Sequence, residues 1–290
     1  MLVKKVNISL FKLPYSAMNV HDSFQEIIDS LMWGFNDLGI ECTFRINEVD
    51  RSCVNIAFGW VNAFNNGLMD IYPQGTILYN MEKWSNQSFV NDPFFHVIAE
   101  KFQIWDYNLA TLEKWRELNT RYAPYYARVS FAPNLIKVQP RADEDIDILF
   151  IGSLNDARAV KIMDCQRNIG VNRNSVVTVS GIWGQRRDDF IARSKVLLNL
   201  SCPGGQYSTF EIVRVSYYLA NKKAVVCEYH PGLEIEDDMR GVLKFMPADS
   251  FAACCDELVH DDEKRKAYAE ECFEVFAQRD VRDVIKGFFV

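Results

Sequence analysis

The chain lacks any run of eighteen apolar residues, and neither of its two expected first strands is followed by a Gly-x-Gly-x-x-Gly motif. The first absence excludes a transmembrane helix, and the second argues against a dinucleotide-dependent redox enzyme. The first six residues begin an expected strand and contain no signal-peptide core. We therefore expect a soluble, cytoplasmic protein with no membrane span.

Metal-ligand spacings and Cys-x-x-Cys pairs are also missing. The four histidines lie far apart, and the eight cysteines are scattered, mostly within apolar segments. This distribution is typical of reduced, buried thiols in a cytosolic protein. Asp145 and Asp147 have the spacing of a metal-binding Asp-x-Asp pair, but they stand directly before an expected strand, where a solvated strand entry is the better interpretation. We expect neither a bound metal nor a cofactor.

An excess of positive charge is absent as well. The net charge is −7 and neither half of the chain is basic, which argues against broad electrostatic binding to nucleic acid. With 290 residues, of which 49% are apolar, the chain is long enough to form two compact domains that each bury a core.

Strand and helix patterns alternate along the N-terminal half. Strands are predicted at residues 5–11, 42–46, 54–59, 75–80 and 129–134. Helical spacing predicts helices from Asp22 to Gly39 and over residues 94–102 and 109–118. This alternation indicates an α/β fold with a parallel sheet covered on both faces. Ligands of such sheets gather beyond the carboxyl ends of the strands.

The C-terminal half repeats this alternation after a charged linker, residues 137–147. We expect domains at 1–138 and 139–290. Strands are predicted at residues 146–152, 175–179, 196–200, 224–226 and 241–246. Helices are predicted from residue 155 onward and over residues 187–195, 208–220, 251–258, 262–279 and 281–289.

The helix expected near residue 208 offers an anion site. Ser208 and Thr209 are natural N-caps, and Glu211 and Arg214 fall at and just after the first turn. Free backbone N–H groups and a partial positive charge at this end, together with Arg214, suit a diphosphate. The alternative is that Glu211 and Arg214, spaced i to i+3, form a surface ion pair.

Three segments carry a resemblance to a known family: ILFIGSLN at 148–155, GIWG at 181–184 and FEIVRVS at 210–216. They resemble the C-terminal half of GT-B glycosyltransferases, in the bacterial and phage group-1-like branch. The likeness begins at Asp145; the first half matches only in its order of elements. It implies two Rossmann-like parallel-sheet domains facing a cleft, with the acceptor side first, the nucleotide-sugar side second and the last helix crossing back to the first domain.

The resemblance implies a donor site in the second domain. Its phosphate-side loop is matched by Gly152, Ser153 and Asn155, with Arg158 adding a charge-assisted contact. The loop with Trp183 usually holds the nucleotide base, although packing between the domains is an equal explanation for this tryptophan. The positions implied to bind the donor are Gly152, Ser153, Asn155, Arg158, Trp183, Gly184, Ser208, Thr209, Phe210, Glu211 and Arg214.

The chain departs from the family in one respect. Retaining members usually carry two glutamates eight positions apart, and the place of the second is taken here by Tyr217. Glu228 and Glu236 have the same spacing but follow the next strand. Retaining and inverting chemistry therefore both stay open.

Candidate bases follow strands of the first domain. Inverting members can place a base beside the first strand's loop, where His21 stands, and Glu82 ends another strand near Trp84. The alternatives are a capping or surface role for His21 and a solvent-facing turn for Glu82. Trp60 and Trp84 either stack on a ligand or belong to the core. Glu211 completes the candidate catalytic set of His21, Glu82 and Glu211.

These observations predict a metal-independent glycosyltransferase that moves a sugar from a nucleotide-sugar to an acceptor hydroxyl. The acceptor is open between a glycan, a small molecule and, less favoured by the acidic charge, DNA. One alternative is a phage-type enzyme that glycosylates a DNA base. Another is a non-catalytic protein that binds a sugar nucleotide.

Overall fold

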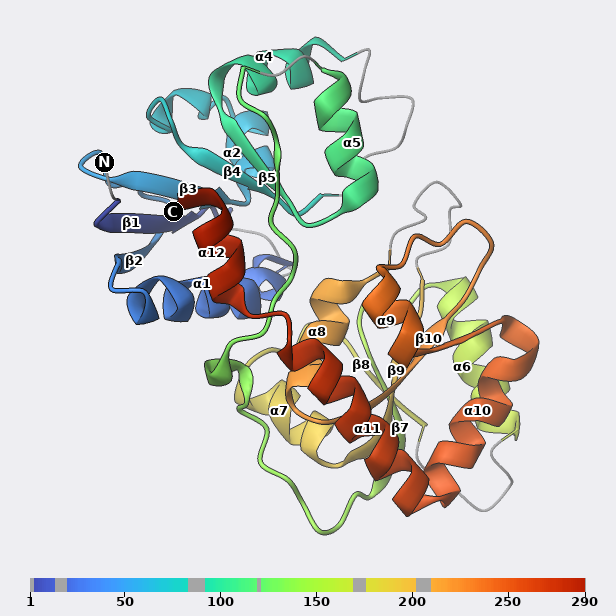
Figure 1. The fold of residues 1–290 in the computed structure, drawn as a ribbon. Helices are drawn as coiled ribbons and strands as arrows, with labels where there is room; N and C mark the ends of the chain where they lie inside the picture. Colours follow the sequence, from blue (N-terminus) through green and yellow to red (C-terminus); the bar gives the residue numbers. More distant parts are fainter. Residues whose placement is uncertain are drawn as a thin grey trace. The chain divides into compact units, whose positions relative to one another are not determined.

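The structure, a computed structural model, describes residues 3–13, 20–82, 92–118, 121–168, 176–201 and 210–289. The chain divides into two compact units (Figure 1): Met1–Ala132 together with Asp280–Val290 form the first, and Pro133–Arg279 form the second. The division falls at 132/133, a few residues before the expected boundary at 138/139. The last helix belongs to the first unit.

A parallel six-stranded sheet forms the centre of the first unit, in the order β2-β1-β3-β4-β5-β6. Strand β1, the second in this order, is buried along nearly its whole length, and its apolar residues alternate with Asn7 and Ser9, which are also buried. The strands are β1 (Lys5–Leu10), β2 (Glu41–Ile46), β3 (Val54–Phe58), β4 (Ile77–Asn80), β5 (Gln103–Asp106) and β6 (Tyr125–Tyr126).

Two helices of the first unit begin at side-chain caps. Asp92 accepts a hydrogen bond from the backbone N–H of Phe94, and Asn108 accepts one from that of Thr111. These caps open α4 and α5. The helical segments are η1 (Val20–Phe24), α1 (Gln25–Asp37), α2 (Trp60–Asn65), η2 (Met69–Ile71), α4 (Pro93–Lys101), α5 (Leu109–Glu117) and α12 (Val281–Phe289).

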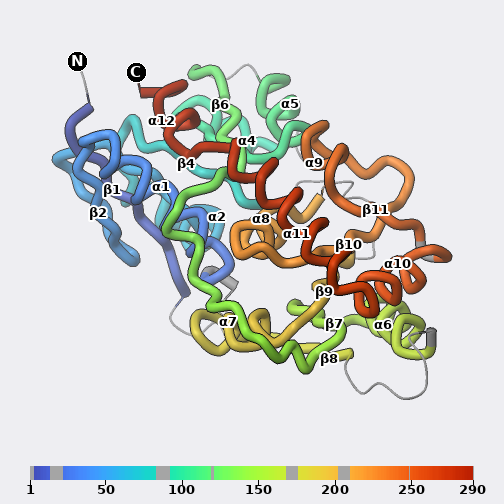
Figure 2. The backbone as a smooth tube through the Cα atoms, turned by 60° about the horizontal axis from the view of Figure 1, so that its bottom comes forward, coloured from blue at the N-terminus to red at the C-terminus, as the bar shows by residue number. Residues whose placement is uncertain are grey.

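The second unit has a parallel five-stranded sheet in the order β11-β10-β9-β7-β8. Its strands are β7 (Ile146–Ile151), β8 (Val176–Val179), β9 (Ser194–Asn199), β10 (Ala224–Glu228) and β11 (Lys244–Met246). Its helical segments are η3 (Pro133–Leu135), α6 (Asp156–Asn168), α7 (Gln185–Ala192), α8 (Ile212–Ala220), α9 (Asp237–Val242), α10 (Ala248–His260) and α11 (Asp262–Ala277). Within this unit α10 lies beside α6, and α11 beside α8 (Figure 2). Two parallel sheets with helices confirm the predicted fold class.

Several elements differ from the sequence predictions, and α2 and β6 were not predicted at all. β5 was missed because it follows α4 directly and ends on a charged residue, Asp106. The predicted strand at 129–134 is wrong: this segment makes one isolated bridge, from Phe131 to Asp280, and Pro133 has no N–H with which to continue a ladder. The acidic segment after β10 contains α9, where the sequence suggested a loop.

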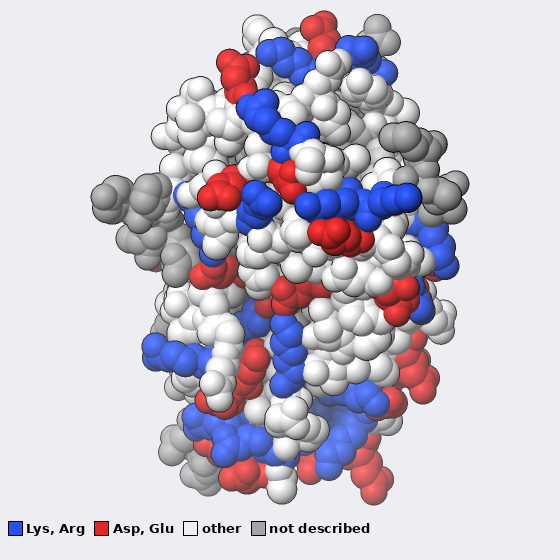
Figure 3. All heavy atoms as spheres, turned by 90° about the vertical axis from the view of Figure 1, so that its left-hand side faces the viewer, with Lys and Arg blue, Asp and Glu red and all other residues white. Residues whose placement is uncertain are grey.

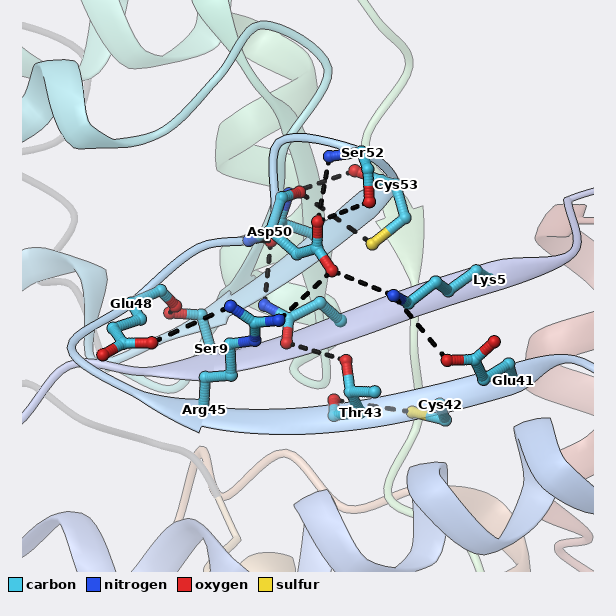
Figure 4. A network of polar contacts seen from close by, with 12 residues as sticks. Lys5, Ser9, Glu41, Cys42, Thr43, Arg45, Glu48, Asp50, Ser52 and Cys53 are labelled. Atoms are coloured by element: carbon cyan, nitrogen blue, oxygen red, sulfur yellow. Dashed lines mark hydrogen bonds and ion pairs between the residues drawn. The ribbon is translucent and has the colours of Figure 1, made fainter.

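A polar strap of residues 47–53 joins β2 to β3 across β1 (Figure 4). Parallel strands are usually joined by a helix, but here backbone crosses the sheet and needs polar partners. Ser9 Oγ donates to the carbonyl of Glu48 at 2.7 Å, and Lys5 Nζ pairs with Asp50 at 3.1 Å. Asn55 accepts from Asp50 N at 2.9 Å and donates to Asp50 O at 2.8 Å. These contacts explain why polar residues interrupt otherwise apolar strands.

Helix α12 returns to the first unit and packs on α1 (Figure 1). Its aromatic end contacts the sheet, since Phe288 and Trp105 stack edge to face at 5.1 Å. The helices approach closely at Gly34, where an added Cβ would lie 2.8 Å from both Ile285 Cδ1 and Val281 Cγ1. Gly34 therefore sets the distance between α1 and α12.

Gly34→Ala is expected to destabilise the protein by up to about 2 kcal/mol, because overpacking costs about 1–3 kcal/mol and a helix-propensity gain offsets about 1 kcal/mol of it. Gly241→Ala in α9 is the matched control. No described atom lies within 4 Å of its added Cβ, so this variant should be neutral or slightly stabilised. Urea unfolding of both variants checks the pair. A Gly34→Ala variant as stable as Gly241→Ala would contradict the close approach.

The structure also bears on the thiols and on membrane insertion. The cysteines within the described residues are all free thiols, and most are buried, as the scattered spacing predicted. In the same parts of the chain, no helix has the length and apolar character needed to cross a bilayer.

Candidate functional site

Arg214 lies at the carboxyl edge of the second sheet, next to the end of β7. It is the third residue of α8, and the Cβ that an alanine would add at Gly152 would lie 3.5 Å from its Nη2. The guanidinium also faces the ring of Phe150, 5.8 Å from the centroid, and donates to Asn199 Oδ1 at 3.3 Å. The absence of a side chain at Gly152 leaves room for a ligand to approach this charge.

The start of α8 differs from the prediction. Glu211 is the N-cap residue and is half-buried, so the cap is neither Ser208 nor Thr209, which lie outside the described residues. Phe210 is 4% exposed and packs edge to face on Phe245. It therefore anchors the helix start in the core, and direct donor contact by its ring is not supported. The first helical residue is Ile212, with Arg214 in the first turn.

Arg158 is buried and bonds to backbone carbonyls, whereas the resemblance implied a contact with the ligand. The residue is 5% exposed, which leaves little access for a ligand. The guanidinium donates to the carbonyls of Ser153 at 2.8 Å, Leu200 at 3.1 Å and Ser201 at 3.2 Å. Arg158 therefore joins the loop after β7 to the loop after β9.

The residues around this junction have supporting roles. Asn155 Oδ1 accepts the N–H of Arg158 at 3.0 Å and so caps α6. Ser153 is exposed and available to a ligand. Glu228, at the end of β10, accepts the N–H of Ser201 at 2.9 Å and forms an ion pair with Lys161. Ser201 is thus held through both its N–H and its carbonyl.

Trp183 belongs to a second cluster at the same sheet edge. Gly184, with φ of 59°, ends the loop after β8 and opens α7. Arg187 stacks on the ring of Tyr217 at 4.1 Å and lies 5.8 Å from that of Trp183. Tyr217 OH donates to Asp188 at 2.9 Å. Tyr217, found where the family has a glutamate, thus brings a carboxylate into this cluster.

Glu82 follows β4 at the carboxyl edge of the first sheet. Its side chain is exposed, yet surrounding protein partly desolvates the carboxylate and raises its pKa. Asn80 accepts from Glu82 N at 3.2 Å and donates to Glu82 O at 2.9 Å. A carboxylate with a raised pKa at a sheet edge is suited to accept a proton. His21 lies in η1, and its side chain is outside the described part of the structure.

Several other candidates are accounted for by packing. Trp60 is 1% exposed and donates to the carbonyl of Tyr79 at 3.1 Å, so it is a core residue; Trp84 lies outside the described residues. Asp145 pairs with Arg193 at 2.5 Å, and Asp147 with Lys195 at 2.7 Å. In the described segments, no three His, Cys, Asp or Glu side chains gather as metal ligands do.

Polar residues that close apolar strands were missed by the sequence analysis. Asn80 ends β4, Asp106 ends β5 and Asn199 ends β9, and all three are buried. Each reaches a neighbouring strand or loop: Asn80 donates to Asp106 at 2.8 Å, and Asn199 accepts from Arg214. The available signal was a polar residue closing an apolar run, at the edge where ligands of parallel sheets bind.

Charge on the surface is mixed. On the face in Figure 3, basic and acidic side chains are interspersed. This agrees with the net charge of −7 and offers no broad basic area on this face for a phosphate backbone.

Comparisons with known proteins identify the fold. HepE of Anabaena, solved with UDP-glucose, superposes with a TM-score of 0.60 at 11% identity, over 97% of each chain. The T4 phage β-glucosyltransferase, solved with its UDP-glucose substrate, gives 0.56 at 12% identity, over 98% of this chain and 99% of that one. WaaG, a glycosyltransferase of lipopolysaccharide biosynthesis, gives 0.56 at 8% identity. At this identity the likeness shows the fold alone, and it is the GT-B fold that the resemblance implied.

Sequence comparisons add little. No family model matches the chain. An uncharacterized protein of Acanthamoeba polyphaga mimivirus is 29% identical over 154 residues, which cover 52% of this chain and 20% of that protein. The match thus spans about a fifth of the length of the viral relative.

Proposed function

From a fold shared with GT-B glycosyltransferases, we propose that this protein transfers a sugar from a UDP-sugar to an acceptor hydroxyl. The observation that carries the proposal is the guanidinium of Arg214, held beside Gly152 at the carboxyl edge of the second sheet. Two neighbours over nearly the whole chain, HepE and the T4 phage enzyme, were solved with UDP-glucose, which supports a uridine nucleotide.

The proposed step separates charge onto the leaving diphosphate. The bond between the anomeric carbon and the diphosphate oxygen breaks while a bond to the acceptor oxygen forms, and the hydroxyl proton passes to a base. Arg214 and the amino end of α8 offset the developing negative charge. Ser153 and the backbone after Gly152 lie at the same edge to contact phosphate oxygens. Because these groups supply positive charge, the proposal includes no divalent ion.

The remaining roles are proposed from position. Trp183 contacts the base of the nucleotide, and Asp188 and Tyr217 lie beside it. Glu82 is the candidate general base, since it is an exposed residue at the sheet edge and partial desolvation raises the pKa of its carboxyl group. His21 and Glu211 remain the other candidates for acid–base roles.

Ligand binding and turnover test the proposal together. UDP or UDP-glucose at about 100 times its Kd should raise Tm by about 5 °C or more, because binding to the folded state adds about 2.7 kcal/mol. ADP-glucose serves as the control nucleotide. Release of UDP from UDP-glucose should persist in EDTA. Absence of both the Tm shift and UDP release would overturn the function; a shift without release or transfer across an acceptor panel would indicate a non-catalytic binding protein.

A DNA acceptor is the second candidate. It is favoured by the likeness to a DNA-modifying β-glucosyltransferase, whose TM-score is 0.55 over 97% of this chain. The net charge of −7 opposes it. A gel shift with duplex DNA that vanishes at moderate salt, together with sugar transfer to the duplex, would support it.

A further inference from the structure

Asn80 holds the backbone on both sides of Glu82. Asn80 is the last residue of β4 and is fully buried. Its Oδ1 accepts from Glu82 N at 3.2 Å, and its Nδ2 donates to Glu82 O at 2.9 Å. Both peptide groups that flank Glu82 are therefore fixed to the rigid end of a central strand, and the direction in which its side chain leaves the sheet is fixed with them.

Asp106 in turn fixes Asn80. The two residues lie side by side in the register of β4 and β5. Asp106 Oδ2 accepts from Asn80 Nδ2 at 2.8 Å and from Trp115 Nε1 at 3.1 Å, and its Oδ1 accepts from Asn108 N at 2.8 Å. Three donors thus converge on one carboxyl group. This orients the Asn80 amide so that its oxygen faces Glu82 N.

A fully buried carboxyl is costly to desolvate, and this one is kept together with three hydrogen-bond donors that an apolar replacement would deprive of their acceptor. Costly polar groups persist most often where a site must be held in a defined geometry. Here the network ends on the backbone N–H and carbonyl of one exposed acidic residue, Glu82.

We propose that Asn80 and Asp106 are positioning residues that aim the Glu82 carboxylate at the acceptor hydroxyl. This inference rests on the proposed transferase function and on Glu82 as its base. We call the hydrogen bonds from Asn80 to the Glu82 backbone, together with the Asp106 carboxyl that orients Asn80, the clamp. Without the clamp, Glu82 keeps its charge but its side chain loses a fixed direction. Since misplacement by about 1 Å can cost a large factor in rate, the defect should appear in kcat while donor affinity, a property of the second unit, stays unchanged.

The chain offers a matched control in Asn55. It is also a buried strand asparagine of the first unit, and it grips Asp50 in the same manner, accepting from its N–H at 2.9 Å and donating to its carbonyl at 2.8 Å. Asn55 lies near the amino end of β3, however, and holds the polar strap. Asn55→Ala therefore reproduces the structural loss of Asn80→Ala without touching Glu82.

The test measures UDP release from UDP-glucose, UDP affinity and Tm for both variants. We expect both to lower Tm by a similar amount, about 2–8 °C. Asn80→Ala should lower kcat about tenfold with an unchanged Kd for UDP, whereas Asn55→Ala should stay within about twofold of the unmodified protein. Equal kcat values for the two variants would overturn the proposal.

A double-mutant cycle separates positioning from a general structural effect. Glu82→Gln alone should lower kcat at least tenfold. Adding Asn80→Ala to Glu82→Gln should then change little, because the clamp has no base left to aim. A further tenfold loss in the double variant, or full turnover by Glu82→Gln, would overturn the positioning role while leaving the transferase itself intact. Failure of the proposed function is distinct, since the unmodified protein would then release no UDP.

Discussion

Arg214→Ala is expected to lower kcat for UDP release from UDP-glucose by about 100-fold, or about 2.7 kcal/mol of transition-state stabilisation. The reason is electrostatic. The guanidinium is fixed by α8, by Asn199 and by the Phe150 ring, so little reorganisation is needed when charge develops on the diphosphate. A preorganised charge of this kind acts more strongly in the transition state than in the bound substrate.

Two further variants make the Arg214 experiment specific. Arg214→Lys keeps a point charge but loses the planar fork, so an intermediate loss of about tenfold is expected. Arg167→Ala removes an exposed arginine of α6, whose side chain is 69% exposed, and should leave kcat unchanged. Steady-state kinetics with circular dichroism to confirm folding provide the measurement. An Arg214→Ala variant that folds and stays within threefold of the unmodified kcat would contradict the phosphate role.

Much of the fold was predictable because apolar runs mark buried parallel strands. β7 and β10 were found from such runs, whereas β1 was found from the alternation of apolar and polar residues over 5–11. The start of α8 was not, because Ser208 and Thr209 satisfy the local capping rule whereas the buried ring of Phe210 sets where the helix begins. Several neighbouring residues suit the N-cap position by residue type, and tertiary packing determines which of them occupies it.

The candidate site was predictable in its charge but only partly in its geometry. The prediction for Arg214 depended on sequence-local information, namely its place one turn into a helix. Arg158 has similar local features, but its guanidinium donates to carbonyls that follow β9, the neighbour of β7 in the sheet. The clamp on Glu82 required knowledge that β4 and β5 are neighbours, and β5 was itself unpredicted. Contacts between strands are nonlocal, and one sequence does not specify them.

Between about pH 5 and pH 7 Asp106 is expected to reduce stability as pH rises. Burial raises its pKa from 3.8 to about 7. In this window the folded protein keeps the proton that the unfolded chain has released. The free energy of unfolding therefore falls by about 1.4 kcal/mol per pH unit. The full effect over about three units is about 4 kcal/mol, and it levels off above the folded pKa.

Comparing variants isolates this contribution from other carboxylates. The difference in unfolding free energy between the unmodified protein and Asp106→Asn should fall by about 2–3 kcal/mol from pH 5 to pH 7 and then stay level. Asp50→Asn is the control with the opposite sign. Hydrogen bonds from Ser52 and the ion pair with Lys5 lower the pKa of Asp50, so its contribution is lost only on acidification below about pH 4 and its difference stays flat in this window.

Tryptophan fluorescence during urea unfolding is the suitable measurement, since five of the six tryptophans lie in the first unit, where both carboxylates reside. A constant difference for Asp106→Asn from pH 5 to pH 8 would mean that the carboxyl is ionised throughout and that its three hydrogen-bond donors outweigh burial. In that case the Asn80 amide would face a permanent anion, and the clamp on Glu82 would keep one strength at every pH of the assay. A difference in unfolding free energy that changes with pH would instead show that Asp106 is protonated below neutral pH. The clamp is then weaker there, because a protonated Asp106 accepts less strongly from Asn80.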